Sequence, residues 1–321
     1  AATWQGATLR GKIYGVSQSP NFQGLYYDRA AFDEAGLPYP DHNYTIDKLM
    51  ADAAALTKKD ADGRVERYGF LTDWAALPFI IGSWIYCFGG RLVSEDRSKA
   101  VFDSPEAIEA LAAMQKIVQD GYAPNNADRG GVGTMELFGQ HKAAMFAGGT
   151  HCAPALTKNA PDLNFAVTTW VEAKVKLCCA SDVGFGIAEL SKHKPEAFDF
   201  LAYMLNKPNL LEYWQRLWVA LPARKSTWYD PGIKKIVGIP DIVSGLSKGE
   251  EEFQAKCHWQ IYAYEQEIVR MDWNNPWSAK MNPVLAEVLD SLLLKTGAAD
   301  PKQAATEANK KLNRIIQENP L

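Results

Sequence analysis

The sequence predicts an α/β fold, because short apolar strands and amphipathic helices alternate along the chain. The chain has 321 residues, which is long enough for two domains and a large core. The sequence contains no internal repeat, no low-complexity tract and no long flexible linker. If there are two domains, we therefore expect several strands to connect them.

The first expected elements are two strands and a helix near the N-terminus. β-forming residues at 13–16 and 25–27 predict the strands, and the polar run at 17–21 predicts a turn between them. Asp28 is expected to cap the helix that follows, and Gly36 to end it. The uncharged side chains of the polar run could line a cleft for a polar ligand, or they could form an ordinary β-turn.

The alternation continues through the rest of the chain. Thr45 is expected to cap a helix, and residues 68–71 to form a strand. Ser104, with proline at the next position, predicts a helix that Gly121 ends. The remaining predicted elements are strands at 143–146 (alternatively the end of a helix), 164–168 and 183–188, and helices from Pro195 to before Pro208, over 283–295 and over 301–317, the last capped by Asp300.

Charge and composition exclude several classes of protein. The net charge is -4 and no run of five basic residues occurs, so the sequence shows no basic region of the kind that binds nucleic acid or an anionic membrane. The longest uncharged run, residues 74–90, is shorter than the ~20 residues of a spanning helix. Residues 1–11 lack the basic and apolar regions of a signal peptide, so none is expected in this sequence. The 10 Trp, 13 Tyr and 13 Phe are enough for a core and for flat faces that cover sugars.

Catalytic and metal-binding motifs are missing from the sequence. The five histidines show no metal-ligand spacing, and no P-loop, GxGxxG or GxSxG motif occurs. The five cysteines form no CxxC pair, and they do not settle the redox compartment. We therefore expect no metal and no cofactor. The paired carboxylates of a glycosidase need not be close in sequence, so a carbohydrate-active enzyme stays open as an alternative.

Several segments follow one another in a characteristic order along nearly the whole chain. They include GLYYDRAAFDEAGLPYP, FGGRLVSEDRSKAVFDSPEAIEALAAMQKIVQDGYAP, FGQHKAAMFAGG, GFGIAELSKHKPEAFDFLAYMLNKP and KTGAADPKQAATEANKKLNRII. Each is weak alone, but the ordered set resembles the extracellular solute-binding proteins of carbohydrate ABC importers, the family that includes maltose-binding protein.

The resemblance implies a two-lobed periplasmic-binding-protein-like fold, in which crossover strands form a hinge and the ligand lies in the cleft. About a hundred residues that form the opening strands and helices of the N-terminal lobe in the family, before the first crossover, have no counterpart here, so this lobe is expected to be incomplete. The implied crossovers are 14–19, 166–171 and 220–224. Residues 1–18 and 166–221 would form the remnant of lobe one together with the hinge strands, and residues 19–165 and 222–321 would form lobe two.

The resemblance also implies a function. The protein would be a non-enzymatic receptor that binds a sugar, an oligosaccharide or a polyol and delivers it to the membrane subunits of an ABC permease. It would work in the periplasm or elsewhere outside the cytoplasm, as a monomer and without a nucleic-acid partner.

The implied ligand site lies on the floor of the cleft, where short polar side chains would bond to sugar hydroxyls. His151 stands where relatives often carry a stacking tryptophan, and it could instead be an ordinary loop residue. Trp84 lies in an apolar helical stretch and could instead belong to the core. The candidate ligand-binding residues are Ser17, Gln18, Ser19, Asn21, Trp84, His151, Trp218, Arg224, Trp273 and Trp277, with the tryptophans as stacking platforms.

Overall fold

The computed structural model describes residues 7–9, 11–74, 77–217, 223–228, 269–270, 276–294 and 297–320. Its strands are β1 (Thr8–Leu9), β2 (Lys12–Ile13), β3 (Val16–Asp28), β4 (Lys58–Lys59), β5 (Val65–Thr72), β6 (Ala143–Gly149), β7 (Phe165–Thr169), β8 (Cys178–Phe185) and β9 (Val269–Arg270). Its helices are α2 (Arg29–Ala35), α3 (Ile46–Leu56), α4 (Leu77–Cys87), α5 (Pro105–Gln119), α6 (Thr134–Gly139), α7 (Cys152–Asn159), α8 (Lys194–Met204), α9 (Lys207–Leu217), α10 (Lys225–Trp228), α14 (Ser278–Leu292) and α15 (Pro301–Glu318).

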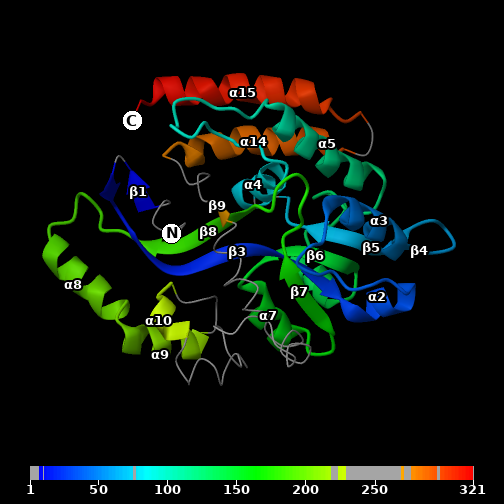
Figure 1. The fold of residues 1–321 in the computed structure, drawn as a ribbon, viewed down its shortest axis with the longest axis horizontal. Coiled ribbons are helices and arrows are strands. Elements are labelled where there is room, and N and C mark those ends of the chain that lie inside the picture. Colours follow the sequence, from blue (N-terminus) through cyan, green and yellow to red (C-terminus); the bar gives the residue numbers. More distant parts are fainter. Residues whose placement is uncertain are drawn as a thin grey trace.

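The long strand β3 organises the main sheet (Figure 1). Its first half, residues 16–22, is antiparallel to β8. Its second half, residues 23–28, pairs with β6 on one edge and with β7 on the other. The sheet continues beyond β6 with β5 and β4, and beyond β8 with β9. A single strand therefore belongs to both halves of the sheet, and β8 is the strand that runs back along its first half.

Helices α5, α14 and α15 pack together on one side of the sheet (Figure 1). The side-chain amide of Gln115 on α5 donates to the carbonyls of Leu292 and Ala299, which ties α5 to the end of α14 and to the loop before α15. On α15, Asn309 and Asn313 accept hydrogen bonds from the backbone of the loop that leads into α5. The C-terminal helices are thus joined to the middle of the chain.

The predicted helix caps are confirmed, because each depends on a side chain next to the backbone that it caps. Asp28 accepts a hydrogen bond from the backbone of Ala30, and Gly36 ends α2 in the left-handed conformation with φ 65°. Thr45, Ser104 and Asp300 each accept from the backbone nitrogen three residues further on. The predicted strand at 143–146 is a strand, β6, and not the end of a helix.

The predicted turn at residues 17–21 is wrong, because these residues lie inside β3. β8 supplies an antiparallel partner for them, with a register irregularity between Ser17 and Ser19. Within the described residues, β8 is the one strand that pairs with this half of β3. Pro20 is tolerated there because no described strand on the other side of β3 needs the N–H that proline lacks. Two predicted boundaries also differ. The strand expected at 183–188 is β8, which spans Cys178–Phe185. The last but one helix, expected to begin at Pro283, begins at Ser278 and continues through Pro283.

Four of the five cysteines lie in the described part of the chain, and all four are buried thiols (Cys87, Cys152, Cys178 and Cys179). Burial raises the pKa of Cys87 and of Cys152 to about 12. Cysteine nucleophiles act as thiolates, so neither thiol is suited to catalysis near neutral pH.

Candidate functional site

Three strand ends meet at one edge of the main sheet. β5 and β6 are parallel, and β7 runs in the direction of β6 because both are antiparallel to β3. These strands end at Thr72, Gly149 and Thr169, and β3 passes the edge with Gln23 opposite Gly149 and Gly24 opposite Thr169. Ligands of open α/β sheets bind outside the carboxyl ends of the strands. We therefore take this edge as the candidate site.

Asn21 on β3 links three segments at this edge. Its Nδ2 donates to Oγ of Ser181 on β8 at 3.2 Å. Its Oδ1 accepts from the backbone nitrogen of Thr150 at 2.8 Å and from the Thr150 hydroxyl at 2.9 Å. Nδ1 of His151 lies 3.4 Å from the same oxygen. We call these four residues the Asn21 cluster. It consists of uncharged hydrogen-bonding groups as long as His151 is neutral.

Gly149 allows Asn21 to approach the end of β6. A Cβ at this position would lie 2.3 Å from Oδ1 of Asn21, which is too close for any side chain. On the core side, the hydroxyl of the buried Tyr26 donates to the Gly149 carbonyl at 2.7 Å. The end of β6 is therefore held from the core and remains open to Asn21.

His151 lies between β6 and α7 and is exposed at the surface of the protein. Desolvation on the packed side of the ring lowers the pKa of His151 below its usual value. The neutral imidazole is therefore the main form at neutral pH, and it can donate one hydrogen bond and accept another.

Sequence reasoning missed three residues at this edge. Asp73 follows β5 and forms an ion pair with Arg129 at 3.3 Å. Oγ1 of Thr72 and Nε2 of Gln23 are buried without a hydrogen-bond partner. An unpaired buried polar atom costs about 1–3 kcal/mol, so these atoms leave capacity for ordered water, but both side chains are completely buried and out of reach of a ligand at the surface of this structure. The end of the predicted strand at 68–71 was the signal that could have identified Thr72 and Asp73.

The predicted residues of the first crossover lie on β3 beside the cluster. Ser17 and Ser19 are half-buried, and Gln18 is buried. The carbonyl of Gln18 accepts a hydrogen bond from the backbone nitrogen of Ala223 at 2.9 Å. This contact brings the segment that carries Arg224 next to β3.

The two predicted tryptophan platforms in the described part of the chain, Trp84 and Trp277, do not lie at this edge. Trp84 is completely buried against Phe70, Trp74 and Trp170. Trp277 is also buried, and its indole N–H donates to the carbonyl of Asn319 at 2.7 Å. Neither ring presents a face to solvent, so both act as core residues in this structure. Trp218 and Trp273 lie outside the described residues.

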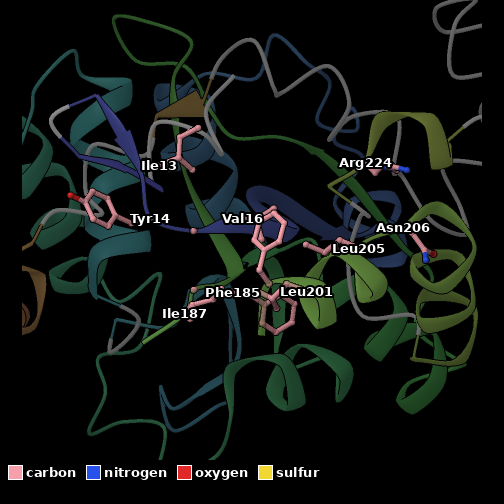
Figure 2. Close-up of a pocket in the computed structure, with 13 residues that line it drawn as sticks. Ile13, Tyr14, Val16, Phe185, Ile187, Leu201, Leu205, Asn206 and Arg224 are labelled. Carbon is pink, nitrogen blue, oxygen red and sulfur yellow. The ribbon is translucent and has the colours of Figure 1, made fainter. Parts of the chain in front are cut away.

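Arg224 lines a second feature, an apolar groove of about 680 Å³ between the start of β3, the end of β8 and α8. Figure 2 shows Ile13 and Tyr14 on one side of the groove and Arg224 with Asn206 on the other. No residue of α8 is buried, and Phe198 is 64% exposed. The groove offers few hydrogen-bonding groups for a sugar, so the Asn21 cluster is the better candidate for a ligand site.

We expect the apolar groove to bind the dye anilinonaphthalene sulfonate in the folded protein, because its exposed rings lie around a space large enough for the dye. Phe198→Ser should lower dye fluorescence at least twofold without a change in circular dichroism. Leu294→Ser is the matched control, since Leu294 is also exposed but does not line the groove. Equal fluorescence of the two variants would contradict this expectation.

Metal and membrane chemistry find no support in the described residues. Within them, no group of three or more His, Cys, Asp or Glu side chains is placed to hold a metal ion. None of the helices in the described part combines the length and the apolar character needed to cross a membrane.

Comparison with known sequences identifies a family. The family model of bacterial extracellular solute-binding proteins matches residues 1–239 of this chain. Putative binding proteins of Brucella abortus and Brucella suis are 25% identical over 208 residues, which is 63% of this chain and 48% of theirs. The match thus spans about half the length of these curated relatives.

Solved structures share the fold. An ABC transporter solute-binding protein from Thermotoga lettingae, bound with alpha-D-tagatose, superposes with a TM-score of 0.78 at 20% identity, covering 98% of this chain and 75% of that one. The Listeria monocytogenes protein in complex with cycloalternan gives 0.76 at 21% identity, covering 98% and 74%. The maltodextrin-binding domain from Bdellovibrio bacteriovorus, bound to maltotriose, gives 0.75 at 18% identity, covering 98% and 76%. The predicted periplasmic-binding-protein-like α/β fold is confirmed.

Proposed function

Because the chain belongs to the family of bacterial extracellular solute-binding proteins, we propose that it is a non-enzymatic receptor for a sugar, an oligosaccharide or a polyol. It delivers this ligand to the membrane subunits of an ABC permease, outside the cytoplasmic membrane, and acts as a monomer. We further propose that the crossovers at 14–19, 166–171 and 220–224 connect two lobes, and that the ligand lies between these lobes beside the Asn21 cluster.

The observation that carries this proposal is the uncharged hydrogen-bonding character of the Asn21 cluster. Sugar hydroxyls both donate and accept hydrogen bonds, and hydroxyl, amide and neutral imidazole groups match them without the cost of burying a charge. Each such bond contributes only about 1 kcal/mol, but an unmatched buried partner costs more, which lets a site distinguish sugars. The sugars in the solved neighbours support the same class of ligand.

The ligand-binding residues that we propose are Ser17, Ser19 and His151, with Gln18, Asn21 and Arg224 beside them. Ser17 and Ser19 lie on β3 in the same stretch as Asn21, and His151 is the exposed member of the cluster. Trp218 and Trp273 remain proposed platforms. Trp84 and Trp277 are left out because both are buried.

We expect neutral sugars, and not sugar phosphates, to raise the melting temperature of the full chain. At a ligand concentration a hundredfold above Kd, binding adds about 2.7 kcal/mol to the free energy of unfolding, which corresponds to a rise of a few degrees. The measurement is a thermal-shift screen with D-tagatose, maltotriose, cycloalternan and sorbitol, and with glucose 6-phosphate as the charged comparison.

The same samples distinguish the receptor from the glycosidase that the sequence left open. Chromatography of maltotriose after incubation with the chain should show no hydrolysis. Turnover would contradict the receptor. A shift with glucose 6-phosphate alone would contradict the neutral ligand.

A further inference from the structure

We propose that Asn21 is a positioning residue that fixes His151 in the tautomer with hydrogen on Nδ1, so that Nε2 is offered to the ligand as a hydrogen-bond acceptor. The positioning role concerns the protein without ligand. The acceptor role of Nε2 toward the ligand rests on the proposed function.

The orientation of the Asn21 amide follows from its neighbours. The backbone nitrogen of Thr150, at 2.8 Å, can only donate, so the Asn21 atom that faces it must be the oxygen Oδ1. Nδ2 then faces the Ser181 hydroxyl, which accepts at 3.2 Å. The absence of a side chain at Gly149 lets the amide pack against the end of β6. The amide is therefore held on both sides.

This orientation decides the tautomer of His151. Nδ1 lies 3.4 Å from Oδ1 of Asn21, and Oδ1 can only accept. A lone pair on Nδ1 would face the lone pairs of this oxygen and repel them, whereas an N–H forms a long hydrogen bond. The tautomer of a histidine is set by the bond that one ring nitrogen makes, so the proton stays on Nδ1 and Nε2 carries a lone pair.

The lone pair on Nε2 has a weak partner inside the protein. Sγ of Cys152 lies 3.6 Å from it, and a thiol is a weak donor. Because burial keeps this thiol protonated, it can donate but cannot form an ion pair with the ring. A ligand hydroxyl is a stronger donor and would replace it. His151 therefore selects a ligand that donates a hydrogen bond at this position.

Asn21 acts through its neighbours in this arrangement. Its oxygen already accepts two bonds from Thr150, and its nitrogen is bonded to Ser181. Its main contribution is to hold Thr150 and His151 in place and not to contact the sugar. Ser181 contributes to the orientation of the amide, and within the described residues it forms no hydrogen bond with the imidazole of His151.

The test is the imidazole nitrogen spectrum of the ligand-free full chain, labelled with ¹⁵N-histidine, with His151 assigned by the signal missing in His151→Gln. We expect the Nδ1–H tautomer in the parent. Asn21→Ala should shift His151 toward the Nε2–H form. Asn21→Asp should retain Nδ1–H and raise the pKa of His151 by half a unit or more, because a carboxylate would then face the ring.

Ser181→Ala is the matched control, since it removes one bond of Asn21 and leaves Oδ1 in place; its tautomer should match the parent. An Nε2–H tautomer in the parent, or an unchanged spectrum in Asn21→Ala, would overturn the positioning role. If Asn21→Ala does not fold, the pKa of His151 in Asn21→Asp decides: no rise overturns the proposal.

Maltotriose binding is measured separately. Asn21→Ala should weaken it at least fivefold, and Asn21→Asp should weaken it less. If the parent chain binds no maltotriose and no other neutral sugar, the proposed function fails while the tautomer result still decides the role of Asn21. If it binds and Asn21→Ala binds equally, Asn21 does not position His151 for the ligand.

Discussion

Gly69→Ala is expected to lower the free energy of unfolding by more than about 3 kcal/mol, or to prevent folding altogether. A Cβ on Gly69 would lie 1.9 Å from the backbone oxygen of Ala53 on α3. The N–H of Gly69 donates to the Thr57 hydroxyl at 3.0 Å, and this hydroxyl donates to the same Ala53 oxygen at 2.7 Å. The added methyl group meets backbone and not a flexible side chain, so α3 and β5 would have to separate.

Urea unfolding followed by circular dichroism measures this effect. Gly133→Ser is the control, because a Cβ on Gly133 meets nothing within 4 Å and its φ of -64° suits any residue. A serine there also precedes α6 at the capping position, so its stability should lie within about 1 kcal/mol of the parent. If both variants unfold at the same urea concentration, α3 and β5 do not approach each other as closely at Gly69 as the structure shows.

Trp84→Ala is expected to lower the free energy of unfolding by about 3–5 kcal/mol, as for other buried aromatic residues. The ring is completely buried, and its centroid lies 5.8 Å from that of Trp170, 6.2 Å from that of Phe70 and 6.4 Å from that of Trp74. Removing it leaves a cavity among three large rings that cannot collapse fully into the space.

The measurement compares the melting temperature and the affinity for a neutral sugar in the same variant. Trp84→Phe, which keeps a ring in the core, should lose less than half as much stability. A sugar-stacking platform would behave in the opposite way: the affinity would fall and the melting temperature would stay unchanged. Such a result would support the role of Trp84 as a sugar-stacking platform that we predicted from the sequence.

The sequence predicted local features of the fold well, because their causes lie within a few residues. The caps at Asp28, Thr45, Ser104 and Asp300 depend on one side chain and the first turn of a helix. The strand at residues 17–21 depends instead on β8, where Ser181 faces Asn21 from 160 positions further along the chain. A polar run with a proline reads as a turn unless that distant partner is known.

The candidate site was predictable only in part for the same reason. Asn21 and His151 were both selected from the sequence, but their contact joins residues 130 positions apart. The tryptophans show the limit of composition. Trp84 and Trp277 are chemically suited to stack on a sugar, but both are buried. The apolar helical stretch around Trp84 already favoured the core, whereas the residues next to Trp277 do not decide between core and surface.

The burial of four thiols makes this chain suitable for single-site covalent labelling. A thiol with a pKa of about 12 is ionised in about one molecule in ten thousand at pH 8, and Cys87 and Cys152 are also closed to reagents by the surrounding core. Cys257 lies outside the described residues and would be replaced by serine. A cysteine introduced at the exposed Ser226, on α10 close to the strand that carries Gln18, then becomes the thiol that a maleimide dye reaches first. The emission of a dye attached there would turn the protein into an optical sensor for its own ligand.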